Sequence, residues 1–191
     1  MSEVDLLAGI LSKTGEVVAG VGSGQLSLPT PCDDYDVETL RNHIVGWLLV
    51  FEAGSHGRSY DGDAGAYRCG ADPAGEFRTA AAGLIAGWEK YGLDREVGVT
   101  GATLPAGMVF NMTVMEYLTH GWDLAVATGQ PVPFTDREAA DALARAEVTL
   151  PPQYRGEGKS FGQIVPVDEH ASALDRFVAF LGREPVPVRA G

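Results

Sequence analysis

Apolar residues recur every three or four positions along most of the chain, which is the spacing of an amphipathic α-helix. The pattern predicts four long helices in the first two thirds of the sequence. They cover about 3–19, 37–54, 73–91 and 105–129. Asp36 and Asp72 precede the second and third stretches as N-cap residues, and Gly92 and Gly129 stand where the third and fourth helices should end.

The rest of the chain predicts shorter elements. Thr135 and Glu138 form a capping box that starts a fifth helix, which ends before Pro151. A last short helix covers the apolar residues around 174–181, and the tail 183–191 is expected to be loose. The stretch VGVTGAT is the one β-like patch, and it is too short to build a sheet alone.

These elements predict an all-α protein built around a four-helix bundle. The four long helices are expected to form the core over about 3–129, with additional short helices in a C-terminal extension over about 130–191. A length of 191 residues is typical of one domain. We therefore interpret residues 1–191 as a single helical-bundle domain.

The charge and the composition exclude several classes of protein. A formal net charge of -12 argues against binding to nucleic acid or to anionic membranes, because both need a basic surface. No apolar run approaches the roughly 18 residues of a membrane helix, and the N-terminus lacks the basic start of a signal peptide. The chain has only two cysteines, Cys32 and Cys69. We therefore expect a soluble cytoplasmic protein with reduced thiols.

The inner face of the fourth predicted helix carries metal-binding chemistry. Glu116 and His120 are four positions apart, so their Cβ atoms lie about 5–6 Å apart on one face. A third donor, His43, lies on the apolar face of the second predicted helix, where an imidazole needs a polar partner. Two imidazoles and one carboxylate leave coordination positions open. This donor set suits catalytic zinc, and also iron or nickel.

Each of these residues also has a simpler explanation. A Glu and a His four positions apart often form an exposed helix pair, and a lone His on an apolar face is often a hydrogen-bonded core residue. Asp123 has three options: it caps the helix, pairs with Arg41 or Arg145, or holds His120 through the second ring nitrogen. The sequence leaves these options open.

The remaining polar residues are interpreted more briefly. Cys32 precedes a helix N-terminus, a position that lowers a thiol pKa, but a small buried residue is the simpler interpretation. His56 and His170 lie in or beside polar loops and are expected to be solvated.

Three segments of the chain resemble a known family. They are TPCDDYDVETLRNHIVG, EYLTHGWDLAVATGQ and FGQIVPVDEHASALDRFVAFLGREP, and their order is that of DinB-like metal-binding proteins. That family is related to mycothiol-dependent maleylpyruvate isomerase. The resemblance covers nearly the whole chain. The chain differs from the isomerase in two respects. We expect it to be too short to contain the extra C-terminal domain of the isomerase, and Tyr35 stands where many relatives have Trp.

The resemblance implies a DinB-like four-helix bundle that holds a divalent metal ion, often zinc. Carried over by position, the ligands are His43, Glu116 and His120. The resemblance also implies a thiol cosubstrate, such as mycothiol, whose sulfur is activated at the metal. A metal ion can deprotonate a coordinating thiol and so make it a nucleophile at neutral pH.

We therefore expect a divalent-metal-binding protein that acts as a thiol-dependent transferase or isomerase. Its partners are a small-molecule thiol and a small electrophile, and a homodimer is one option for its oligomeric state. One alternative is a non-catalytic metal- or ligand-binding protein associated with stress, with its site closed by a fourth ligand. Another is a helical interaction module in which the His and Glu residues only bond each other.

Overall fold

The computed structural model describes residues 2–156, 159 and 161–185. Within these residues the chain is mostly helical, with a small two-stranded sheet. The elements in order are α1 (Glu3–Ala19), η1 (Ser23–Gln25), α2 (Val37–Ser55), α3 (Pro73–Tyr91), β1 (Glu96–Val99), β2 (Ala102–Pro105), α4 (Ala106–Thr128), α5 (Asp136–Thr149), η2 (Pro152–Tyr154) and α6 (Ala173–Phe180). The predicted all-α class is confirmed.

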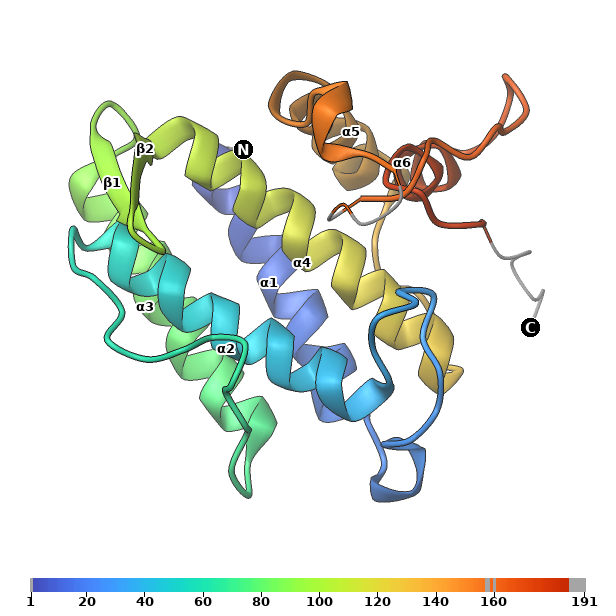
Figure 1. Cartoon of the computed structure of the whole chain (residues 1–191), viewed down its shortest axis with the longest axis horizontal. Helices are drawn as coiled ribbons and strands as arrows, with labels where there is room; N and C mark the ends of the chain where they lie inside the picture. Colours follow the sequence, from blue (N-terminus) through green and yellow to red (C-terminus); the bar gives the residue numbers. More distant parts are fainter. Residues whose placement is uncertain (1, 157–158, 160, 186–191) are drawn as a thin grey trace.

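Helices α1 to α4 run side by side and form the bundle (Figure 1). Helix α1 packs against α3 and α4, and α2 packs against the same two helices, so the four enclose a shared core. Large aromatic side chains fill this core, among them Phe77, Trp88, Phe110 and Tyr117, which are all buried. Burial of such rings contributes a large share of the hydrophobic stabilisation of a small domain.

The helix boundaries follow the expected capping residues. The side chain of Asp36 accepts a hydrogen bond from the backbone N–H of Thr39 at the start of α2, and Asp72 caps α3 in the same way. Gly92 and Gly129 follow α3 and α4 with φ angles of 68° and 70°, a left-handed backbone that favours glycine. These start and stop predictions are therefore confirmed.

The β-like patch, residues 97–103, forms most of a hairpin rather than a single strand. β1 and β2 pair antiparallel across a turn at Thr100 and Gly101. Val97 and Val99 of β1 are buried, and the strand contacts α2 and α4. A two-stranded hairpin is marginal by itself, so packing against the bundle accounts for its presence here.

Helices α5 and α6 extend the bundle on the side of α4 (Figure 1). Helix α5 packs against α4, and α6 packs against α5. The predicted capping box of α5 is present, with Thr135 and Glu138 each accepting a backbone hydrogen bond from the other. The prediction of a loose tail is wrong at its first residue, because Arg183 is buried; residues 186–191 of that tail lie outside the described residues. Among the described helices, none combines the length and hydrophobicity that crossing a membrane requires.

Candidate metal centre

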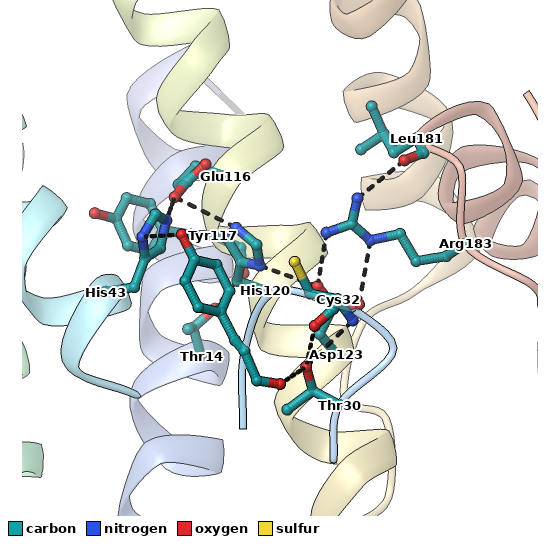
Figure 2. Close-up of polar contacts among 11 residues, drawn as sticks. Thr14, Thr30, Cys32, His43, Glu116, Tyr117, His120, Asp123, Leu181 and Arg183 are labelled. Atoms are coloured by element: carbon teal, nitrogen blue, oxygen red, sulfur yellow. Dashed lines mark hydrogen bonds and ion pairs between the residues drawn. The ribbon is translucent and has the colours of Figure 1, made fainter. Parts of the chain in front are cut away.

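Helices α2 and α4 bring the three predicted donor residues together in space. His43 Nε2 lies 2.8 Å from Glu116 Oε1, and His120 Nε2 lies 3.5 Å from the same oxygen. The three donor atoms all lie within 4.8 Å of one another. Figure 2 shows both imidazoles directed toward the Glu116 carboxylate, one from each helix.

The spacing of these atoms suits a small divalent cation. Zinc bonds to nitrogen and oxygen are about 2.0–2.1 Å long, so a tetrahedral arrangement places neighbouring ligand atoms about 3.3 Å apart. The two distances to Glu116 Oε1 lie on either side of that value. Small side-chain adjustments would therefore let all three atoms bond one ion.

The second nitrogen of each imidazole has a partner of its own. The Tyr35 hydroxyl lies 3.1 Å from His43 Nδ1, and Asp123 Oδ2 lies 3.0 Å from His120 Nδ1. Contacts of this kind orient the ring so that its Nε2 faces the position where a metal would bind. For His120, the arrangement is that of the carboxylate–histidine pairs found behind many zinc ligands.

Asp123 is itself held by a residue that sequence reasoning missed. Arg183 donates from Nε and Nη2 to the two carboxylate oxygens of Asp123, at 3.3 and 3.0 Å, and from Nη1 to the carbonyl oxygen of Leu181. Of the options that the sequence left open for Asp123, the contact with His120 is the one observed, and pairing with Arg41 or Arg145 is not. Arg183 follows the end of α6, so no helical periodicity marks it and no local pattern indicates its contact with Asp123.

Both carboxylates of the centre have lowered pKa values despite their burial. Burial alone would raise the pKa of Glu116, but His120 and His43 outweigh it and lower that pKa to about 2. Burial also opposes ionisation of Asp123, and its contacts with His120 and Arg183 overcome this and lower its pKa. Both carboxylates are therefore ionised at neutral pH.

The loop before α2 covers one side of the centre. The Thr30 hydroxyl lies within hydrogen-bond distance of the carbonyl oxygens of Cys32 and Tyr35, which closes the loop on itself. Burial raises the pKa of the Cys32 thiol to about 11, although the nearby Arg183 acts in the opposite direction. The thiol pKa is therefore raised rather than lowered, and Cys32 is partly buried rather than the fully buried residue of the simpler sequence interpretation.

Cys32 also belongs to a second group of potential donors. Its sulfur lies within 4.8 Å of donor atoms of His120 and Asp123. In that group, however, the Asp123 carboxylate already accepts hydrogen bonds from Arg183 and His120. The group of His43, Glu116 and His120 therefore fits a cation better.

Another Glu–His pair on α2 provides an internal comparison. Glu52 Oε1 lies 3.5 Å from His56 Nε2, the same separation as in the pair on α4. His56 Nε2 also lies 2.9 Å from the Gly83 carbonyl oxygen, so the expectation of a solvated His56 is wrong, whereas His170 is 87% exposed. The described residues supply no third donor beside Glu52 and His56.

Comparisons with known proteins point to one family. Residues 7–125 match the family described as "Mycothiol maleylpyruvate isomerase N-terminal domain". The chain is also similar to an uncharacterized protein of Mycobacterium tuberculosis, named Rv0738 in strain H37Rv and MT0763 in strain CDC 1551. Each alignment is 30% identical over 174 residues and covers 87% of this chain and 90% of the relative. No solved structure matches the chain.

Proposed function

Because the chain belongs to the family of the mycothiol maleylpyruvate isomerase N-terminal domain, we propose that it is a metal-dependent enzyme that uses a small-molecule thiol. The reaction class is transfer of the thiol to a small electrophile, or thiol-assisted isomerisation of that electrophile. One observation carries the proposal: Nε2 atoms from two helices converge on the Glu116 carboxylate while other residues hold both Nδ1 atoms.

The chain offers three ligands for a divalent cation. His43 and His120 would bind it through Nε2, and the ionised Glu116 carboxylate would offset half of its charge. Zinc suits this set best, and nickel and iron(II) are compatible with it. The chemistry that such a cation supplies is deprotonation of a coordinated thiol at neutral pH. Mycothiol is the thiol that the family description names.

Two features of the surrounding residues favour an open, catalytic site. Three protein ligands leave a position for a small molecule, and the side chains of His43 and Glu116 are 17% and 22% exposed. We assign the role of nucleophile to the bound small-molecule thiol rather than to Cys32, whose thiol pKa is raised by burial. Tyr35 is placed to orient His43 through Nδ1.

The proposal is tested by product formation with a panel of small electrophiles. Metal-free and zinc-loaded protein would each be incubated with a low-molecular-weight thiol, and adducts or isomers would be followed by mass spectrometry. We expect products only with the zinc-loaded protein, and a large loss of rate in Glu116→Gln. Glu52→Gln is the matched control, because it changes a glutamate in a Glu–His pair without a third donor.

Two outcomes would count against this function. Products that form equally well without metal would remove the role of the cation. Tight zinc binding with no turnover across a broad panel would instead favour the non-catalytic metal-binding alternative.

A further inference from the structure

The C-terminal extension reaches the candidate metal centre through one buried arginine. We infer that Arg183 is a positioning residue: it fixes the Asp123 carboxylate, which in turn fixes the His120 imidazole so that Nε2 faces Glu116. The inference rests on the proposed function, because it concerns the same centre. It adds a residue outside the segment that matches the family.

The contacts of Asp123 form a chain of three groups (Figure 2). Asp123 Oδ2 accepts hydrogen bonds from both Arg183 Nη2 and His120 Nδ1, and Oδ1 accepts from Arg183 Nε. Two bonds from one planar guanidinium define the plane of the carboxylate as well as its position. The plane of the carboxylate then sets where the imidazole N–H must point.

Burial makes this arrangement sensitive to the loss of Arg183. Asp123 is fully buried and Arg183 is only 8% exposed. Removing one partner of such a pair leaves an uncompensated charge, whose remaining partner in the site is His120. The carboxylate would then reorganise around the imidazole, and the direction of Nε2 would no longer be fixed.

The fold delivers Arg183 to this position from a distant part of the chain. The residue follows the end of α6, where Gly182 has a φ angle of 85° and turns the backbone. Arg183 N donates to the carbonyl oxygen of Val178, and its side chain donates to that of Leu181, so the segment is tied to its own helix. Helix α6 packs on α5, which packs on α4, the helix that carries Asp123.

The test compares zinc affinity and cobalt spectra in full-length variants. Arg183→Met should weaken zinc binding about 10- to 100-fold in competition with a chelator, the usual effect of losing an outer contact of a ligand. The visible spectrum of bound cobalt should change as well, because the His120 ring is no longer fixed. Arg145→Met is the matched control: it removes a partly buried, ion-paired arginine that does not contact Asp123, and it should change affinity less than threefold.

A double-mutant cycle separates this role from a merely structural one. If Arg183 acts through Asp123, adding Arg183→Met to Asp123→Asn should cost no further affinity. Additive losses would overturn the inference. Arg183→Lys keeps the positive charge but lacks the planar guanidinium, so its zinc affinity should lie between those of the wild type and Arg183→Met. This variant replaces Arg183→Met in the test if the methionine variant does not fold.

A measurement on metal-free protein distinguishes failure of this inference from failure of the proposed function. Nitrogen-correlated NMR of the histidine side chains should show the His120 Nδ1–H signal, and Arg183→Met should shift or broaden it while Arg145→Met leaves it unchanged. An unmoved signal together with wild-type zinc affinity in Arg183→Met would overturn the inference. A wild type that binds no metal would overturn the proposed function, and the NMR result would still decide the role of Arg183.

Discussion

His43 Nε2 lies 2.8 Å from Glu116 Oε1, although 73 positions separate the two residues in the chain. The contact joins α2 to α4 and needs a proton between the nitrogen and the oxygen. A divalent cation would take the place of that proton and bond both atoms, with His120 as a third ligand. Metal binding should therefore cross-link two helices of the folded protein and have no equivalent in the unfolded chain.

Removal of metal is expected to lower the thermal stability of the wild type. A ligand that binds only the folded state, at a free concentration about one hundred times its Kd, adds about 2.7 kcal/mol to the free energy of unfolding. Calorimetry with added zinc and with a chelator should show this difference in melting temperature. His43→Ala should abolish the difference, and His56→Ala should retain it. Equal shifts in wild type and His43→Ala would contradict binding between the two helices.

The proximity of Glu116 and His120 could be predicted from the sequence because helical spacing fixes which side chains share a face. The spacing was not sufficient by itself, however. Glu52 and His56 have the same spacing as Glu116 and His120 and the same 3.5 Å separation. Among the residues that the structure describes, only the pair on α4 faces a third donor, His43, and that depends on how two helices pack. The helix faces already indicated His43, Glu116 and His120, and the family resemblance led to the same three residues, but spacing alone does not exclude a pair such as Glu52 and His56.

The parts that could not be predicted depend on tertiary packing. Arg183 lies beyond the last helix, and its burial depends on how α6 and α5 dock on α4. The β-like patch spans both strands of the hairpin, and their pairing across the turn at Thr100 and Gly101 depends on burial of Val97 and Val99 against the bundle. Helix ends were predictable because capping acts within a few residues.

Both cysteines are expected to react slowly in the folded protein. Burial raises the pKa of Cys32 and of Cys69 from 9.0 to about 11, so at pH 8 the thiolate population falls about a hundredfold. Labelling of metal-free protein with iodoacetamide should be about a hundredfold slower than in denaturant and should accelerate about tenfold per pH unit. Labelling of the single variants Cys32→Ser and Cys69→Ser assigns each measured rate to one cysteine. Labelling of folded Cys32 as fast as in denaturant would show that its environment favours the thiolate.

Glu138 is expected to make stability depend on pH. Burial opposes its ionisation, but hydrogen bonds from Lys13 and Thr135 hold its pKa below the ordinary value. Because the pKa of Glu138 is lower in the folded protein, its ionised carboxylate stabilises the fold at pH values above the unfolded-state pKa of about 4.3. This stabilisation is lost as the pH falls through the folded-state pKa. Glu138→Gln should cost roughly 1 kcal/mol at pH 7, measured by urea unfolding, and the difference should shrink between about pH 5 and pH 3.

The control for this pH dependence is on the same helix. Glu147 is exposed on α5, so Glu147→Gln should leave the stability nearly unchanged at every pH. A stability difference between wild type and Glu138→Gln that is constant from pH 7 to pH 3 would show that the carboxylate charge is not responsible.

The metal content of the purified protein tests the proposed centre most directly. Wild type prepared without a nickel column and incubated with zinc should carry about one ion per chain by elemental analysis. His43→Ala and His120→Ala should each lose most of it, and His56→Ala should match the wild type. A wild type without bound metal, or a His43→Ala variant that keeps the full amount, would contradict a site built by α2 and α4 together.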